Sequence, residues 1–376
     1  MQSLGKRMQS FAVNLLKEML EVYTPTGHET KLAQFLFERM KILELEPYID
    51  EAGNVIGEFG EGTPTILFCG HMDTVEGKLP INLKEGRLYG RGAVDAKTSL
   101  AAMVMAASNL IKSNFTGKLI VAGVIDEEGE GRGIKQLIKD GIKADYAVFG
   151  EPSGVNQITV AYKGSLHIKV SVQTITGHSS APWLFDNAVE KAFEIYKLLR
   201  TIDFSSERKD SRFYSLSSCL TKIAGGTSSS RIPSKCSLHI DFRIPPLIST
   251  GDVFNEIRRI GNEYELQHPK VGLRIEALDS CEPYETSTNS LLIRSLSWAI
   301  RMIRGKPATW VRKTGTSDMN IYGASIKIPI VAYGAGESIL DHTNNESINL
   351  KEYGDSIQVL NKGIIRLLEL SKKKLT

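Results

Sequence analysis

Histidine and carboxylate residues follow directly on short apolar segments at several points in this 376-residue sequence. The apolar segments are residues 65–69, 119–125 and 146–149. They are followed, in that order, by His71 and Asp73, by Glu127 and Glu128, and by Glu151. Continuous apolar segments of this length are typical of strands buried on both faces of a sheet. Because ligands bind beyond the carboxyl ends of such strands in open α/β sheets, we expect these side chains to share one edge.

Two further residues are expected at the same edge. Asp95 lies just before an Ala-rich segment, residues 99–111, that is typical of a helix, and His342 follows the apolar residues 328–333. Carboxylates gathered at one edge repel one another unless protons or cations neutralise them. Oxygen and imidazole ligands without thiolate suit zinc, cobalt or manganese. Two histidines and at least three carboxylates are too many ligands for one tetrahedral ion. The pattern therefore predicts two metal ions that share one bridging carboxylate.

Each of these residues also has a plainer interpretation. A single histidine after a strand is usually a loop residue, and an adjacent pair such as Glu127 and Glu128 is usually solvated. Asp95 alone is typical of a helix N-cap. Their joint placement at one predicted edge favours the metal site. Because successive residues at a strand end point in different directions, one of the two glutamates can bind metal while the other acts as a general base.

The elements that position these groups indicate an α/β domain with a mostly parallel sheet flanked by helices. Apolar residues at three- and four-residue spacing predict helices at residues 8–20, 32–43, 291–303 and 350–368.

The middle of the chain has a different pattern, typical of a small α+β domain. Apolar and polar residues alternate along segments 165–172 and 236–242, which predicts half-buried strands. We expect four strands and two helices there, inserted as residues 161–276. Residues 1–160 plus 277–376 then form the metal-binding domain.

Composition and charge exclude several classes of protein. The formal charge of +3 and the lack of a long basic run argue against nucleic acid as the partner. No stretch approaches the ~20 apolar residues of a membrane span, and the N-terminal residues lack the apolar core of a signal peptide. Four widely spread cysteines without a Cys-x-x-Cys pair favour a reducing compartment. We therefore expect a cytoplasmic protein.

The motifs, in this order, resemble the acetylornithine deacetylase, succinyl-diaminopimelate desuccinylase and glutamate carboxypeptidase family of two-zinc amidohydrolases. The resemblance rests on residues 71–75, 90–95, 126–129, 150–153 and the late His342, and it extends over nearly the whole chain. It implies two zinc ions, with cobalt as an alternative. By this resemblance, His71 and Glu151 bind one ion, Glu128 and His342 bind the other, and Asp95 bridges the two.

The resemblance also assigns the remaining roles. Glu127 is the general base that takes a proton from metal-bound water as the water attacks an amide. Asp73 orients His71. The inserted domain serves as a lid and as the interface of a homodimer, and its His178 steadies the oxyanion of the transition state.

Within this family, residues 92–97, 162–165 and 311–321 are most similar to hydrolases that release lysine or ornithine from the amino-group carrier protein LysW. The implied partner is this acidic carrier, charged with lysine or ornithine on the side chain of its C-terminal glutamate. Lys163, Lys313 and Arg231 are candidates for a basic patch that attracts it.

The sequence also offers candidates for binding the amino acid that is released. Arg243 and Arg312 are candidates for its α-carboxylate, although each also fits a solvated strand end. Asp318 or Glu337 is a candidate for its cationic side chain.

Three alternatives remain open. In the first, the enzyme class is the same but the substrate is a small N-acyl amino acid, such as N-acetylornithine or N-succinyl-diaminopimelate, or a dipeptide. A second alternative is a non-catalytic binding protein on the same fold. The third, a nucleotide-binding protein, rests on glycines at 90, 92, 129, 131 and 133, which form no complete dinucleotide fingerprint.

Overall fold

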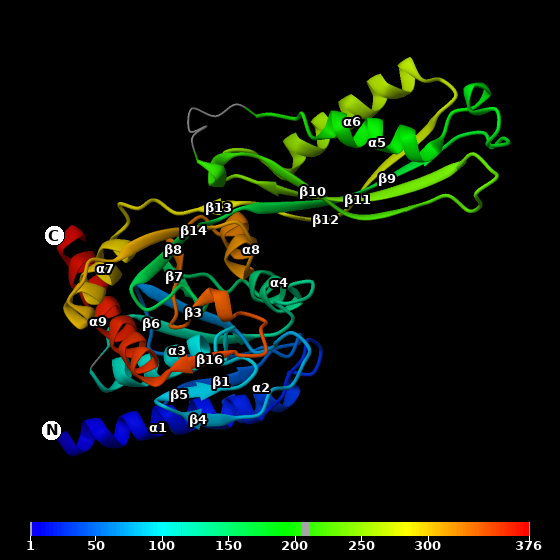
Figure 1. Ribbon diagram of the computed structural model, residues 1–376. Coiled ribbons are helices and arrows are strands. Elements are labelled where there is room, and N and C mark those ends of the chain that lie inside the picture. Colours follow the sequence, from blue (N-terminus) through cyan, green and yellow to red (C-terminus); the bar gives the residue numbers. More distant parts are fainter. Residues whose placement is uncertain (1, 114, 205–210, 376) are drawn as a thin grey trace. The chain divides into compact units, whose positions relative to one another are not determined.

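The computed structural model describes residues 2–113, 115–204 and 211–375 (Figure 1). The chain divides into two compact units. The first unit comprises Met1–Val160, Thr286–Arg312 and Ser317–Thr376, and the second comprises Ala161–Glu285 and Lys313–Thr316.

The first unit is built on a mixed sheet with a parallel centre. The central strands, in spatial order, are β6 (Lys118–Val124), β3 (Thr65–His71), β7 (Tyr146–Phe149) and β15 (Ile330–Ala332). Antiparallel strands extend both sides: β2 (Val55–Phe59) and β1 (Glu46–Ile49) beyond β6, and β8 (Gln157–Tyr162) beyond β15. β8 also pairs with β14 (Thr309–Lys313) and, at its end, with β13 (Tyr284–Glu285). The predicted α/β class is thereby confirmed.

Helices pack on this sheet because their apolar stripes need cover. The buried helix α3 (Lys97–Lys112) packs on β3 and β6, and Gly70 lets the two elements approach, since an added Cβ would lie 3.3 Å from the Cβ of Leu100. α1 (Gln2–Glu21) and α9 (Leu350–Leu375) pack against α3, and α7 (Leu291–Arg304) packs against α9. The other helices are α2 (Thr30–Ile42), α4 (Arg132–Lys139), α8 (Asp318–Ser325) and the 3-10 turn η3 (Ser338–Leu340). Within the described residues, none of the helices combines the length and the apolar character that crossing a membrane requires.

A small antiparallel sheet joins two distant segments of the first unit. Its strands, in spatial order, are β16 (Ser347–Asn349), β5 (Arg87–Tyr89) and β4 (Asn82–Lys84). Ser347 pairs with Tyr89, so the segment after His342 lies beside the segment that leads to Asp95.

The second unit is an antiparallel sheet with helices on one face. Its strands, in spatial order, are β10 (Ser217–Gly225), β11 (Lys235–Ile244), β9 (Gly164–Gln173) and β12 (Gly272–Cys281). The helices α5 (Ala188–Leu199) and α6 (Thr250–Gln267) cover the apolar face, where alternate residues such as Ile168 and Ile240 are buried (Figure 1). Two short 3-10 turns, η1 (Pro182–Leu184) and η2 (Arg212–Tyr214), lie in its connections.

The expected insert and the second unit differ in detail. The sequence placed the end of the insert at residue 276, whereas the second unit runs to Glu285 because β12 continues to Cys281. The fourth expected strand is β10. The sequence does not predict it because its apolar residues occur in adjacent pairs and do not alternate with polar ones.

Candidate metal centre

The parallel strands bring three groups of acidic and imidazole side chains to one edge of the sheet. Cys69 on β3 lies opposite Ala122 of β6 and Phe149 of β7, so the carboxyl ends of the three strands are level. His71 is the last residue of β3. Glu127 and Glu128 follow the end of β6, and Glu151 follows β7, in the crevice position where α/β sheets bind ligands.

Asp95 and His342 reach the same place through a buried ion pair. Glu346 accepts hydrogen bonds at Oε1 from the backbone N–H groups of Val94 (2.9 Å) and Asp95 (3.1 Å). Arg91 donates from Nη1 to Oε2 of Glu346 (2.8 Å) and to the carbonyl of Thr343 (3.2 Å). The loop that carries Asp95 and the loop that carries His342 are therefore tied together.

The two imidazoles converge on the carboxylate of Asp95. His71 Nε2 lies 3.1 Å from Asp95 Oδ1, and His342 Nε2 lies 3.1 Å from Asp95 Oδ2. His342 Nε2 is also 2.9 Å from Glu128 Oε1.

The ligand atoms form two groups, each with its atoms within 4.8 Å of one another. The groups are His71, Asp95 and Glu151, and Asp95, Glu128 and His342. Asp95 belongs to both, and imidazole with carboxylate is a ligand set that suits zinc or cobalt. The donor types of these two groups therefore suit two ions, and Asp95, which both groups share, stays the predicted bridging ligand.

Asp73 has more contacts than the sequence suggested. The expected partnership with His71 takes the form of a 2.9 Å hydrogen bond between His71 Nδ1 and the Asp73 carbonyl, with the Asp73 carboxylate 3.5 Å away. The carboxylate itself accepts the backbone N–H groups of Glu127 and Glu128, each at 3.1 Å, and the hydroxyl of Thr26 at 2.9 Å. Asp73 thus fixes the backbone of both candidate glutamates as well as the imidazole.

The carboxylates of the cluster shift the pKa values of its histidines in the direction that favours positive charge. Hydrogen bonding to Asp95, against the opposing effect of burial, raises the pKa of His342 to about 9. Burial lowers the pKa of His71, but the hydrogen bonds to Asp73 and Asp95 outweigh it and raise that pKa well above its usual value. Burial raises the pKa of Asp95, yet the two imidazoles bring it below the usual range. The carboxylates therefore favour positive charge beside them, which metal cations supply in such a site.

Glu127 and Asp318 are two buried acids whose pKa values lie well above the usual range. Burial, reinforced by the charges of Asp318 and Asp95 and opposed by His71, raises the pKa of Glu127 well above its usual value. Burial likewise raises the pKa of Asp318, whose two carboxylate oxygens are shielded from solvent and have no hydrogen-bond partner among the described residues. The predicted role of Asp318 in binding the cationic side chain of the substrate stays a prediction.

The other predicted site residues lie outside the cluster. Arg312 is exposed on β14, and Glu337 is 61% exposed, 3.9 Å from Arg87. Arg243 and His178 belong to the second unit. Arg243 Nε donates to Asp241 Oδ2 at 2.9 Å. His178 Nδ1 accepts the backbone N–H of Ser180, which leaves the proton of a neutral imidazole on Nε2.

The sequence alone assigns no role to Arg91 or Glu346. Arg91 lies between two glycines in the motif that leads to Asp95. Because 255 residues separate the two partners, only the folded chain reveals the contact.

Comparison with known proteins gives this geometry a family. Residues 67–366 match the model of peptidase family M20/M25/M40. A LysW-lysine/LysW-ornithine hydrolase from Saccharolobus islandicus is 34% identical over 357 residues, which is 94% of this chain and 94% of that protein. A Pyrococcus furiosus protein provisionally named for the same activity is 36% identical over 356 residues, covering 94% of this chain and 97% of its own length.

Solved structures share the fold. A tripeptidase from Staphylococcus aureus superposes with a TM-score of 0.80 at 20% identity, covering 96% of this chain and 99% of that one. A dinuclear metal-binding peptidase of the M20 family from Bacillus subtilis superposes with a TM-score of 0.75 at 14% identity, covering 96% and 99%. This chain belongs to peptidase family M20/M25/M40 and is a metallohydrolase that acts on amide or peptide bonds.

Proposed function

We propose that this chain is a two-metal amide hydrolase that releases lysine, ornithine or both from the carrier protein LysW in lysine and arginine biosynthesis. The observation that carries the proposal is the similarity, along 94% of the chain, to hydrolases named for LysW-lysine and LysW-ornithine. The bond to be cleaved is the amide between the side chain of the carrier's C-terminal glutamate and the α-amino group of the product.

The proposed metal ions are zinc, with cobalt as an alternative. His71 and Glu151 would hold one ion, Glu128 and His342 the other, and Asp95 both, in line with the two groups of ligand atoms. Bound ions supply Lewis-acid polarisation of the amide and lower the pKa of water.

Glu127 is the proposed general base. At one of its carboxylate oxygens it accepts a proton from the attacking water, and it then delivers that proton to the leaving nitrogen. The raised pKa of Glu127 makes its carboxylate a better acceptor for the proton of the attacking water. The hydrogen bond from the Glu127 backbone to Asp73 holds the residue in place.

The second unit would supply the oxyanion donor and part of the substrate contact. His178 is exposed, and its Nε2 proton is available to donate to charge that develops on the amide oxygen. Arg243 of this unit, or Arg312 of the first unit, would bind the α-carboxylate of the product. A homodimer formed through this unit is part of the proposal, and analytical ultracentrifugation tests it.

The first experiment measures free amino acid released by zinc- or cobalt-loaded enzyme. Substrates are LysW-lysine and LysW-ornithine, beside N-acetylornithine and N-succinyl-diaminopimelate. We expect rapid release from the charged carriers, and the ratio of lysine to ornithine identifies the preferred product. Release only from the small acyl amino acids would retain the hydrolase and refute the carrier as its substrate.

The second experiment tests the proposed base. Glu127→Gln is expected to keep two equivalents of metal and to lose about 10²–10⁴-fold in kcat. The matched control is Glu130→Gln, an exposed glutamate three positions along the chain. Normal turnover by metal-loaded Glu127→Gln would remove this residue from the mechanism.

A further inference from the structure

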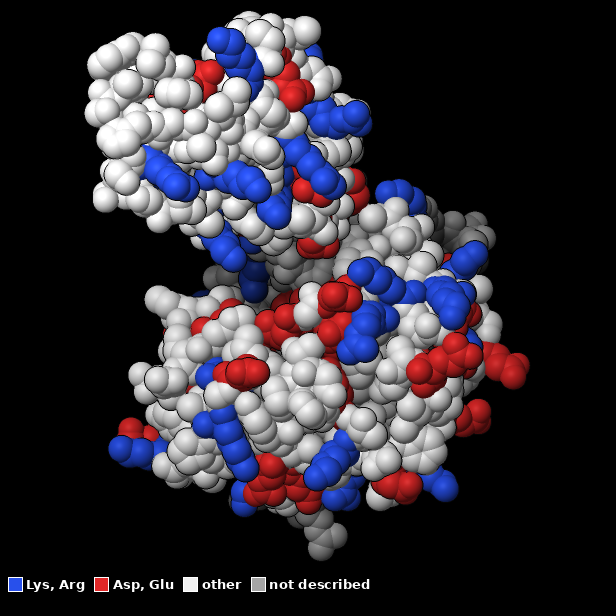
Figure 2. Space-filling model, turned by 90° about the vertical axis from the view of Figure 1, so that its right-hand side faces the viewer, with Lys and Arg blue, Asp and Glu red and all other residues white. Residues whose placement is uncertain are grey.

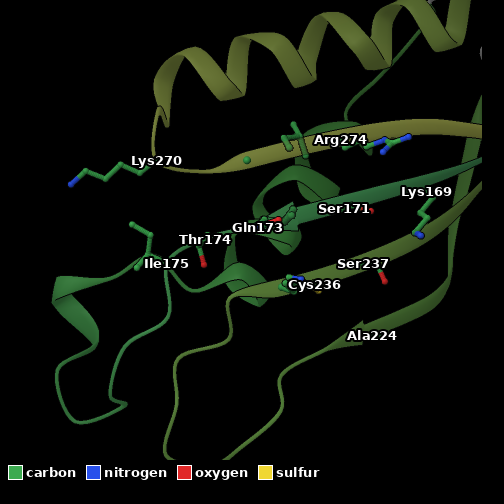
Figure 3. Close-up of a pocket in the computed structure, with 14 residues that line it drawn as sticks. Lys169, Ser171, Gln173, Thr174, Ile175, Ala224, Cys236, Ser237, Lys270 and Arg274 are labelled. Carbon is green, nitrogen blue, oxygen red and sulfur yellow. The ribbon is translucent and has the colours of Figure 1, made fainter.

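The second unit has one sheet face that α5 and α6 do not cover. Along β9, Lys169, Ser171 and Gln173 alternate with buried residues and lie on this open face. A groove of about 710 Å³ lies there, and Figure 3 shows that its lining comes from several strands and from the loop before β12.

The groove is strongly basic. Four lining residues are cations: Lys169, Lys235, Lys270 and Arg274. Among the described residues that line the groove, none is acidic, and the remainder includes the polar Ser171, Gln173, Thr174 and Ser237. Glu276 contacts Arg274 at 2.7 Å from outside the lining, in a pair whose arginine is 75% exposed. Figure 2 shows Lys and Arg side chains gathered on this unit, in the upper part of the view.

The strand register spreads the charges over a wide area. Lys169 lies opposite Glu276 on β12, so Arg274 is one same-face position away and the two Cα atoms are roughly 8 Å apart. Lys169 lies opposite His239 on β11, so Lys235 is two same-face positions away, at roughly 14 Å. Four cations spread over this width carry more positive charge than a single phosphate or carboxylate neutralises, whereas several acidic side chains on a protein surface can match it.

We propose that this groove docks an acidic surface of the protein that carries the amino acid to be released. The inference rests on the proposed function, in which the substrate is attached to a protein. A two-fold interface between copies of this chain would place the same cations against each other, which disfavours self-association through this face. The predicted basic patch shares none of these residues, and Lys163 of that patch is buried with its ammonium donating to the Ser215 carbonyl.

The test compares a carrier substrate with a small one. LysW-lysine and the dipeptide Nα-γ-glutamyl-lysine contain the same amide, and kcat/KM is measured for both at low and at high ionic strength. The variant K169E/K235E/R274E reverses three charges of the groove. The matched control, K197E/R200E/R258E, reverses three exposed charges at α5 and α6, on the covered side of the sheet.

We expect the groove variant to lower the ratio of kcat/KM for LysW-lysine to that for the dipeptide by roughly tenfold or more at low salt. The loss should arise mainly in KM and should shrink at high salt, because screening weakens charge attraction between surfaces. The neutral variant K169Q/K235Q/R274Q should show a smaller loss in the same direction. The helix-side control should change the ratio much less.

Three outcomes would overturn the proposal, and they differ from one another. Hydrolysis of the dipeptide but not of LysW-lysine by the unmutated enzyme would refute the proposed function and the docking site with it. Efficient hydrolysis of LysW-lysine with an unchanged ratio in both groove variants would refute the docking site alone. Dissociation of a dimer by the groove variant, seen by ultracentrifugation, would show that the face binds a second copy of this chain.

Discussion

Replacement of Glu346 by alanine should destabilise the first unit more than an ordinary loss of a salt bridge. The Arg91 and Glu346 side chains are 6% and 1% exposed, and their closest atoms are 2.8 Å apart. The carboxylate also accepts two backbone N–H groups, from Val94 and Asp95. Alanine leaves a buried guanidinium without its counter-ion and two backbone donors without their acceptor.

The expected cost follows from this burial. Removal of one partner of a buried ion pair costs about 3–5 kcal/mol in the free energy of unfolding. Glu346→Gln keeps an acceptor oxygen and should cost about 1–3 kcal/mol. Glu337→Ala is the matched control, because Glu337 is 61% exposed and 3.9 Å from Arg87 in the same segment of chain. An exposed pair of this kind contributes about 0–1 kcal/mol.

Urea-induced unfolding of the metal-free proteins, followed by circular dichroism, measures these differences. Titration with cobalt provides a second measurement, since Glu346 holds the backbone of Asp95, the residue common to both groups of candidate ligands. Loss of such an outer contact typically weakens metal binding about 10–100-fold. If Glu346→Ala has no larger effect than Glu337→Ala on either the free energy of unfolding or cobalt affinity, the buried ion pair does not organise the site.

Three further variants test other contacts of the first unit. Asp73→Asn should weaken cobalt binding about 10–100-fold. The control Asp50→Asn alters another carboxylate that accepts backbone N–H groups, and it should leave cobalt affinity unchanged. Equal effects of the two variants would show that Asp73 has no special role in metal binding. His342→Ala should bind one cobalt equivalent fewer than the unmutated protein, while His268→Ala keeps the full number, and two retained equivalents in His342→Ala would contradict the proposed ligand set. Burial lowers the pKa of Lys97 from 10.5 to about 7. Between these two pH values the unfolded chain binds more protons than the folded chain does. The free energy of unfolding should therefore rise with pH in this range, by up to about 1.4 kcal/mol per pH unit. Lys97→Met should remove that rise, and an unchanged slope in its urea titrations would show that Lys97 is not its source.

Much of the fold was predictable because its signals are local. The apolar segments at residues 65–69, 119–125 and 146–149 correspond to β3, β6 and β7. An uninterrupted apolar segment of this length is typical of a strand that is buried on both faces, inside a sheet covered by helices. The Ala-rich segment before residue 112 became the buried helix α3. β10 was not located because an exposed strand at the edge of a sheet carries little apolar alternation.

The amino-acid sequence is enough to identify which residues are available for chemistry and where they occur relative to each strand. His71, Glu128 and Glu151 follow strand ends in the sequence, and parallel pairing brings strand ends together wherever such a sheet forms.

The contacts that hold these groups at bonding distance appear only in the folded chain. Three such features join residues far apart in the chain: the contact of Glu346 with Arg91 and Asp95, the backbone hydrogen bonds accepted by Asp73, and the basic groove of the second unit. Such contacts leave no periodic signal, because their energy depends on burial and on distances that exist only after the chain has folded.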